Sequence, residues 1–514
     1  MACGSDSADG STEVTQGFDP AALSFPNANL VLISMDTLRA DRLGVYGNTR
    51  GLTPNIDAFA ASAVLFEEAY SNSPKTASSH MSLFTSRLPT VHKVRNQSAR
   101  LDLLSPTLAG NRLSIAQVLN RAGYLNVGLA GGANVHPDMG FAKGFRGNFS
   151  SQLSDFSDQV KSAGKHWRTL RKRPEPSFMF VHSYQVHGPY LPPAELQERF
   201  VRTPSPLLEP RVKAFTGLPR HEQWRLMNKG GLNGHPAYWD GKENFGPAEA
   251  SYLSDLYDAA IADMDVSMGD LFARLENQGA FADSIIVLLA DHGEEFFEHG
   301  GFEHNALHRE HLHVPLLVRL PDGHLGGTRV RGLAQLIDVM PTLLDLLVLE
   351  GPDDLQGQSL TSAMQSGRVA GDRPVIAENV MFLPKGEYGG ALRNAAGLVI
   401  YDWDLSVDPA GRLEAFDLNA DPREQSDQLG ASDGLQTLAK SLKAVLADAH
   451  RLRDLLDATD AGGTMGDNLG ADDAAALSQG LAAMGYFGGG DEPPPEVTDA
   501  QVAGTPLEDW PEDG

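Results

Sequence analysis

Continuous apolar runs of strand length are the first regular feature of the chain. They occupy residues 29–35 (NLVLISM), 177–183 (SFMFVHS), 284–290 (SIIVLLA) and 314–320 (VPLLVRL). Runs of this length without alternating polar positions are typical of strands buried on both faces of a sheet. We therefore expect these four segments to form the centre of one large sheet.

Helical periodicity fills the stretches between these runs, at residues 55–68, 113–122, 252–277 and 336–347. Strands that alternate with helices predict an α/β fold, with a parallel or mixed β-sheet sandwiched by helices. In such sheets ligands bind outside the carboxyl ends of the strands. The residues that directly follow the apolar runs are therefore the first place to look for chemistry.

The pattern changes near residue 372, where short strands (398–403 and 413–418) and an amphipathic helix (435–456) predict a small α+β unit. Residues 195–250 are irregular and too long for a plain connection, which is typical of a lid-like insertion. The predicted division has four parts: a flexible N-terminal tether at 1–25, a main domain at 26–371 that includes the insertion at 195–250, a C-terminal α+β subdomain at 372–456, and an acidic, mostly disordered tail at 457–514.

Charge changes this picture mainly at the C-terminus. The 514 residues include 41 Lys+Arg and 67 Asp+Glu, a net charge of -26. Residues 457–514 hold 13 acidic residues and no Lys or Arg, so the other 456 residues carry only -13. A segment of this composition is typical of a disordered tail. The acidity argues against a nucleic-acid partner and against docking on an anionic membrane.

The N-terminus carries the single cysteine, Cys3, which excludes an intrachain disulfide and a Cys-based zinc site. No apolar run is long enough to span a bilayer. The sequence Ala-Cys-Gly-Ser at 2–5, followed by a polar stretch, resembles the end of a bacterial lipobox. Two interpretations stay open: a start site placed too late on an exported, periplasmic or cell-envelope lipoprotein anchored at Cys3, or an incidental cysteine on a soluble protein.

Polar groups follow three of the apolar runs. Asp36 follows the first run, the segment at 187–190 follows the second, and Asp291 with His292 follows the third. Each has an ordinary structural interpretation, such as a helix N-cap for Asp36. Because they fall at strand ends of one predicted sheet, however, they form the mixture of oxygen and nitrogen donors that divalent metals prefer.

The order and spacing of longer segments resemble the sulfatase family within the alkaline phosphatase superfamily. The similarity covers roughly residues 27–455. The matching segments are NLVLISMDTLRADRLG (29–44), TPNID (53–57), AY (69–70), SLFTSRLP (82–89), HGPYLP (187–192), DHGEE (291–295), VP (314–315), DVMPT (338–342) and FDLNADPR (416–423). The resemblance implies an alkaline-phosphatase-like mixed sheet sandwiched by helices, and it would make 26–371 the catalytic domain.

The resemblance also implies roles for individual residues. Asp36, Asp291 and His292 fall on metal-ligand positions, and Thr76 falls on the position of the nucleophile, which also binds the metal. One divalent ion is therefore expected.

Four further residues fall on substrate-side positions of the family. His187 matches a substrate-contacting histidine, and His304 matches a Lys or His that contacts the anionic group or leaving oxygen. His80 stands where the family signature has arginine, and Asn96 corresponds to a substrate-binding Asn.

Departures from the family pattern restrict the chemistry. Sulfatases mature a Cys or Ser to formylglycine within Cys/Ser-x-Pro-x-Arg, but residues 76–80 read TASSH. Threonine cannot become formylglycine, because oxidation of its secondary alcohol gives a ketone. Thr37 replaces a second Asp, and His292 replaces an Asn. The smaller number of carboxylates favours Mn²⁺, Zn²⁺ or Fe²⁺, with Ca²⁺ or Mg²⁺ as alternatives, and Gln185 in place of Asp argues against a second ion.

Three functions remain open from the sequence. The first is a metal-dependent hydrolase that cleaves a small sulfate or phosphate ester through a covalent Thr76 intermediate. Phosphorus is favoured, because a threonyl ester lacks the elimination route of formylglycine, so water must attack the central atom. The second is a phosphotransferase acting on lipid or glycan head groups, and the third is a non-catalytic binding protein on the same fold.

Overall fold

The computed structural model of the chain describes residues 23–96, 108–132, 134–152, 154–218, 222–223, 242–380, 388–403 and 412–460. Most of the predicted tether, the middle of the predicted lid-like insertion and the acidic tail from 461 onward lie outside the described residues.

A nine-stranded mixed sheet forms the centre of the molecule. Its order is β11-β2-β10-β6-β1-β5-β3-β4, with the short β9 paired to β2. The strands are β1 (Asn29–Met35), β2 (Val64–Tyr70), β3 (Leu125–Ala130), β4 (Phe149–Ser151), β5 (Ser177–Ser183), β6 (Ser284–Ala290), β9 (His313–Val314), β10 (Leu316–Arg319) and β11 (Arg329–Gln335). The three central strands β6, β1 and β5 are parallel, so their carboxyl ends meet at one edge.

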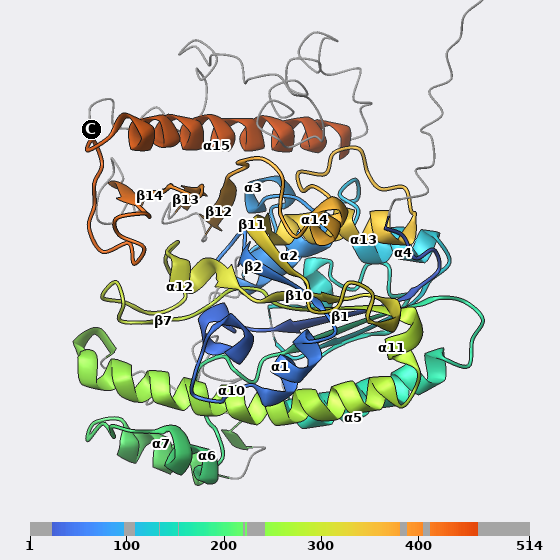
Figure 1. The fold of residues 1–514 in the computed structure, drawn as a ribbon, viewed down its shortest axis with the longest axis horizontal. Coiled ribbons are helices and arrows are strands. Elements are labelled where there is room, and N and C mark those ends of the chain that lie inside the picture. The colour runs from blue at the N-terminus through green and yellow to red at the C-terminus, as the bar shows by residue number, and fades with distance from the viewer. Residues whose placement is uncertain are drawn as a thin grey trace, which may run out of the picture.

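Helices cover both faces of this sheet, as predicted (Figure 1). The helices are α1 (Pro54–Ala60), α2 (Thr76–Thr85), α3 (Pro89–His92), α4 (Ile115–Arg121), α5 (Phe156–Leu170), α6 (Ala194–Phe200), α7 (Glu209–Thr216), α10 (Pro247–Glu276), α11 (Ala280–Asp283), α12 (Arg309–Leu312), α13 (Val339–Leu347), α14 (Thr361–Ser366) and α15 (Asp433–Asp460). Helices α1, α5 and α10 lie on one face, and α2, α4, α13 and α14 lie on the other. The α/β fold class is therefore confirmed.

Two predicted elements were wrong in part. The helix expected over 55–68 ends at Ala60, and residues from Val64 onward form β2. The apolar run at 64–66 pairs there with both β10 and β11, and this tertiary pairing overrides the helical periodicity. The strand expected over 314–320 is divided into β9 and β10 at Pro315, which has no N–H to donate.

A second, antiparallel sheet follows the main one. It comprises β12 (Val375–Val380), β13 (Tyr388–Arg393), β14 (Gly397–Trp403) and β15 (Arg412–Asp417). Helix α15 lies across this sheet and also packs on α3 (Figure 1). Leu442 and Leu446 of α15 are fully buried there, in one cluster with Leu88 and Val91 at α3.

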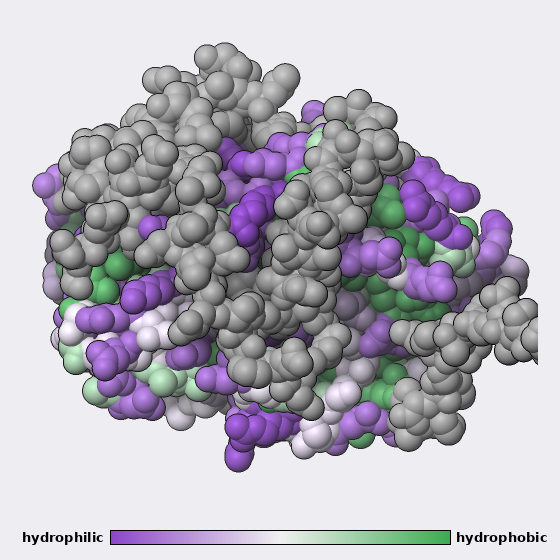
Figure 2. Space-filling view, turned by 90° about the horizontal axis from the view of Figure 1, so that it is seen from above, coloured by the Kyte–Doolittle hydropathy of each residue, from purple (hydrophilic) through white to green (hydrophobic). Residues whose placement is uncertain are grey.

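The surface of the described part is mainly polar. In the coloured part of the face seen from above, Figure 2 shows polar residues with smaller apolar patches between them. Among the described residues, the exposed large hydrophobics are Leu207, Val266 and Val348. The helices of the described part include none that is both long and apolar enough to cross a membrane.

Candidate active site

Three polar residues lie at the meeting point of the central strands. Asp36 follows β1, where its backbone N–H donates to the Ser183 carbonyl at the end of β5 (2.9 Å). Asp291 and His292 follow β6, and all three side chains are completely buried. Neither aspartate caps a helix, so the N-cap interpretation of Asp36 is wrong.

Thr76 reaches the same point from α2. It is the first residue of this helix, after Lys75 at the N-cap position, and every residue of the helix is buried. The Thr76 Oγ1 atom lies 3.2 Å from His292 Nε2. The structure therefore brings Asp36, Thr76, Asp291 and His292, the four predicted ligands, to one place.

One imidazole nitrogen and two carboxylate oxygens of this group carry lone pairs and lie close together. His292 Nδ1 donates to the Gly293 carbonyl (3.0 Å), so Nε2 of the neutral ring carries the lone pair. The Nε2 atom lies 3.4 Å from Asp291 Oδ2 and 3.8 Å from Asp36 Oδ1. Both of these carboxylate oxygens are buried without a hydrogen-bond partner. A cation would satisfy all three atoms at once, so the residues fit a divalent metal.

Electrostatics support this interpretation. Burial and then the nearby Glu294 raise the pKa of Asp36 well above its ordinary value, and burial and then Asp36 do the same for Asp291. Burial lowers the pKa of His292. Two buried carboxylates that repel each other are costly unless a positive charge lies between them.

Thr37 adds backbone strain at this point. It has a positive φ of 58°, which is unusual for a β-branched residue. Two contacts hold this conformation: the Thr37 N–H donates to Asp291 Oδ1 (3.2 Å), and Tyr257 donates to the Thr37 carbonyl (2.6 Å). Strained backbone is common where a site must be pre-organised.

His187 lies beside this group, in the loop after β5. Its ring stacks on Tyr184 with centroids 4.1 Å apart. Nδ1 donates to the Gly188 carbonyl (2.7 Å), so the Tyr184 hydroxyl donates to Nε2 (3.0 Å). Both ring nitrogens are thus engaged, and burial lowers the pKa of His187.

His304 completes a row of imidazoles. Its ring centroid lies 4.6 Å from that of His292 and 5.1 Å from that of His187. Its Nδ1 lies 3.0 Å from Glu294 Oε1, and Tyr190 donates to the other oxygen of Glu294 (2.8 Å). Burial raises the pKa of Glu294 to about 7, and burial together with Lys75 lowers the pKa of His304.

His80 lies behind Thr76. Its Nδ1 donates to the Thr76 carbonyl (2.8 Å), and Ser34 donates to its Nε2 (2.9 Å). His182 of β5 lies against it, with ring centroids 4.7 Å apart, and reaches Asp36 Oδ2 at 3.2 Å. His182 and Glu294 were missed at the sequence level. His182 is hidden inside an apolar strand, and only its position one residue before the strand end marks it.

Asn96 and Lys75 lie at the start of α2. The Ala77 N–H donates to Asn96 Oδ1 (2.7 Å), so this side chain holds the first turn of the helix. Lys75 donates to Asn305 Oδ1 (2.6 Å) and is only 6% exposed. Its charge lowers the pKa values of His187, His292 and His304, which places a cation close to the site.

Solved structures with similar folds extend this description. The phosphonate monoester hydrolase of Agrobacterium radiobacter is 21% identical, with a TM-score of 0.62, and the match covers 84% of this chain and 96% of that one. A second solved structure is of a protein in complex with its substrate, D-glucosamine-2-N,6-O-disulfate. That protein is 19% identical to this chain, with a TM-score of 0.61, and the match covers 83% of this chain and 98% of that one.

Two relatives that are similar in sequence are arylsulfatases. An arylsulfatase of Clostridium perfringens is 24% identical over 466 residues, which cover 79% of this chain and 91% of that protein. Arylsulfatase K of Xenopus laevis is 22% identical over 453 residues, which cover 82% and 83% respectively.

These solved structures share the fold of the chain, with its helix-covered mixed sheet. The Sulfatase family profile matches residues 28–349, more than half of the chain. The chain belongs to the sulfatase family and is a hydrolase acting on ester bonds.

Proposed function

We propose that this protein hydrolyses sulfate or phosphate esters with Thr76 as the nucleophile and one divalent metal as cofactor. The observation that carries the proposal is the convergence of Thr76 Oγ1, His292 Nε2 and two unpartnered carboxylate oxygens at the N-terminus of α2. If this cluster had only a structural role, its buried carboxylate oxygens would be expected to have hydrogen-bond partners.

Asp36, Asp291, His292 and Thr76 would hold the metal. When bound, a divalent ion supplies Lewis acidity, which lowers the pKa of the threonine hydroxyl and stabilises negative charge on the reacting group. Mn²⁺, Zn²⁺ or Fe²⁺ fits this mixed oxygen and nitrogen set best.

The Thr76 hydroxyl loses its proton to solvent, and its oxygen attacks the central sulfur or phosphorus atom in line. A covalent Thr76 ester forms as the bond from that atom to the leaving oxygen breaks. The Lys75 charge and the N-terminal end of α2 favour an anionic group there. The pair of His304 and Glu294 holds a proton in its 3.0 Å hydrogen bond and delivers it to the leaving oxygen. Water then opens the ester.

His80, Asn96 and His187 support this reaction by holding its geometry. His80 holds the Thr76 carbonyl, and Asn96 holds the next backbone amide. Tyr184 donates a hydrogen bond to His187, and the row of imidazoles lies beside His187. When substrate displaces the Tyr184 hydrogen bond, His187 can turn toward the non-bridging oxygens of the substrate.

Both sulfatases and phosphonate monoester hydrolases occur among the similar proteins. A threonine at residue 76 favours one of the two chemistries. A threonyl ester must be opened by attack on the central atom, which phosphorus accepts more readily than sulfur. The preferred substrate of this chain is therefore a small phosphorus ester, with sulfate esters as the alternative.

The test is an activity assay on the purified chain with p-nitrophenyl sulfate, p-nitrophenyl phosphate and bis-p-nitrophenyl phosphate, each with several divalent metals. Thr76→Ala is expected to abolish turnover, and Thr76→Ser is expected to retain part of it. Thr85→Ala is the matched control, because Thr85 lies on the same helix and its hydroxyl donates within that helix, to the Met81 carbonyl.

Turnover that survives in Thr76→Ala would exclude this nucleophile. Turnover that is unchanged after chelation and dialysis would exclude the metal. Transfer of the phosphoryl group to an added alcohol in place of water would indicate the phosphotransferase alternative.

A further inference from the structure

The histidine-rich segment 292–313 holds six of the 16 histidines, and the proposed reaction uses only His292 and His304. His299 lies in the hairpin between β7 (Glu295–Phe296) and β8 (Phe302–Glu303), and His308 is the N-cap of α12. The two rings stack face to face, with centroids 3.6 Å apart and an angle of 5° between planes. This pair has no role in the chemistry described above.

Carboxylates surround the stacked pair. His308 Nδ1 lies 3.1 Å from Glu424 Oε2, and His299 Nε2 lies 3.1 Å from Glu310 Oε2. His299, His308 and Glu424 each offer a ligand atom, and these atoms lie within 4.8 Å of one another. Donors around one tetrahedral zinc ion are roughly 3.3 Å apart, so the two rings would have to rotate out of their stack to close the set.

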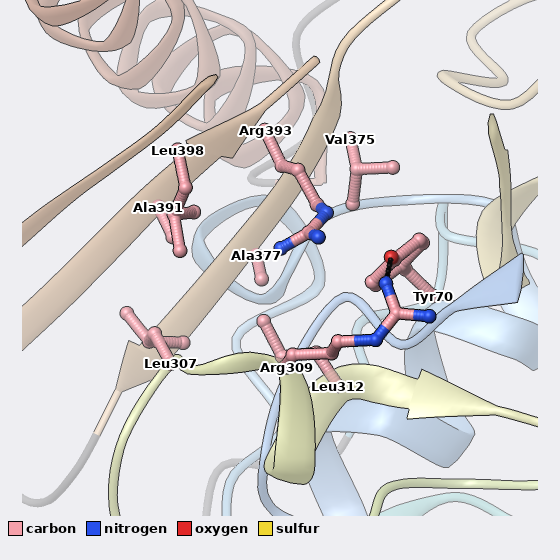
Figure 3. A pocket seen from close by; sticks show the side chains of 9 residues that line it. All are labelled: Tyr70, Leu307, Arg309, Leu312, Val375, Ala377, Ala391, Arg393 and Leu398. Carbon is pink, nitrogen blue, oxygen red and sulfur yellow. Dashed lines mark hydrogen bonds between the residues drawn. The ribbon is translucent and has the colours of Figure 1, made fainter. Parts of the chain in front are cut away.

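Glu424 is built into this position. It follows β15, has a positive φ of 58° and is 1% exposed. Arg393 donates to its Oε1 (2.6 Å), while Oε2 faces His308. Figure 3 shows Arg393 and Arg309 converging on Tyr70 in the adjoining cavity. These contacts fix the carboxylate and keep it ionised, since the Arg393 charge and His308 lower its pKa to about 2.

Two face-to-face imidazoles cannot both carry a proton cheaply, because like charges would lie only 3.6 Å apart. Glu310 favours the charged form of His299. A divalent ion bound here would take the place of the N–H protons that His308 and His299 direct at Glu424 and Glu310. Both histidine side chains are 11% exposed, which leaves a path for an ion from solvent.

We propose that His299, His308 and Glu424 form a second, structural transition-metal site suited to Zn²⁺, separate from the candidate active site. The ion would tie the β7–β8 hairpin and α12 to the C-terminal sheet, which these segments approach in Figure 1. Binding releases the proton of His299 to solvent, so affinity rises with pH. Glu310 is the nearest additional donor and would complete the coordination.

The test removes the active-site ion first. The full chain carrying Asp291→Asn is stripped with a chelator, dialysed and titrated with Zn²⁺, with metal content and thermal midpoint as readouts. One equivalent of zinc and a rise in Tm are expected. Cobalt(II) in the same protein should give a visible absorption band of a nitrogen- and oxygen-ligated ion.

Two variants in the Asp291→Asn background identify the ligands. His299→Phe keeps a flat ring for stacking but removes the donor, and His308→Gln keeps a hydrogen-bonding group beside Glu424. Each is expected to lose the equivalent of zinc and the rise in Tm. His166→Ala, on the exposed face of α5, is the matched control and should change neither.

Absence of zinc from Asp291→Asn would overturn the proposal and leave a plain network of His–Glu ion pairs. Zinc that stays bound in both ligand variants would also overturn it. Because these readouts do not involve turnover, they stand apart from the test of Thr76.

Discussion

At the scale of single residues, the site depends on buried side chains that position the predicted metal ligands through hydrogen bonds. His80 and His182 lie behind the predicted ligands, and their hydrogen bonds reach the Thr76 carbonyl and the Asp36 carboxylate. Partners of this kind orient ligands and contribute to metal affinity. Part of the site's precision therefore comes from residues that no substrate touches.

His182→Ala is expected to weaken metal binding about 10- to 100-fold, because Asp36 would lose the contact that fixes its Oδ2. Titration of the stripped protein with Mn²⁺ or Zn²⁺ measures this change. His166→Ala, an exposed histidine on α5, should leave the dissociation constant unaltered. An affinity in His182→Ala equal to that of the wild type would count against a role for His182 in positioning Asp36.

Glu378 gives a prediction for stability and pH. It is buried on β12, accepts from the Thr90 N–H (2.6 Å), and burial raises its pKa to about 7. Between the unfolded pKa near 4.5 and this value, the folded state holds the proton more tightly, so stability falls as pH rises. Glu378→Gln should gain about 2.5 kcal/mol relative to wild type between pH 5 and pH 8.

Urea unfolding at both pH values measures this difference. Glu195→Gln serves as the control, because it makes the same substitution at an exposed position on α6. If the difference in unfolding free energy between Glu378→Gln and the wild type were the same at both pH values, Glu378 would have the same pKa in the folded and unfolded states.

Sequence reasoning identified the residues that follow strands. Asp36, Asp291 and His292 were recognisable because each comes directly after an apolar run, and Thr76 through its resemblance to the family signature. His182 was not recognisable, because it occupies an inward position in a strand that reads as core. Strand β2 was mistaken for helix because pairing with β10 and β11 decides its conformation, and a local pattern cannot show such pairing.

At the scale of elements, the turn after β6 is under a steric restriction. A Cβ on Gly293 would lie 2.0 Å from the Glu310 carbonyl, while the Gly293 N–H donates to the His311 carbonyl (2.7 Å). The turn that carries Asp291 and His292 thus packs directly on the backbone of α12. Any side chain at residue 293 must therefore displace either this turn or the backbone of α12.

Gly293→Ala is expected to lower kcat/KM at least tenfold and to destabilise the fold by about 1–3 kcal/mol through overpacking. Steady-state kinetics and chemical unfolding measure the two effects. Gly434→Ala is the matched substitution, because the nearest atom to its Cβ would be 3.8 Å away. Full activity in Gly293→Ala would show that the backbone of α12 yields without moving the ligands.

At the scale of the whole molecule, the main domain and the C-terminal subdomain share a hydrophobic cluster. Leu88, Val91 and Ile337 of the main part pack with Leu442 and Leu446 of α15. The far end of α15 is also held, because Arg112 donates to Asp457 Oδ1 (2.6 Å) and to the Val91 carbonyl (2.8 Å). The predicted catalytic domain at 26–371 therefore leaves an apolar surface open when it is isolated.

A chain that ends at residue 371 is expected to aggregate and to lack activity, because it exposes this cluster to water. A chain that ends at residue 460 keeps every described element and should retain activity. Size-exclusion chromatography and the ester assay compare the two. A monomeric, active chain ending at 371 would contradict the coupling.

The packing of α3 against α15 has a consequence for recombination between relatives. Helix α2 carries Thr76, and α3 follows it after only a few residues, so the nucleophile and residues 433–460 are joined through one cluster. A crossover placed in the connection near 371 would combine a nucleophile segment with a foreign C-terminal helix. Chimeras, and natural exchanges of gene segments, should therefore succeed only when 76–92 and 433–460 come from the same parent.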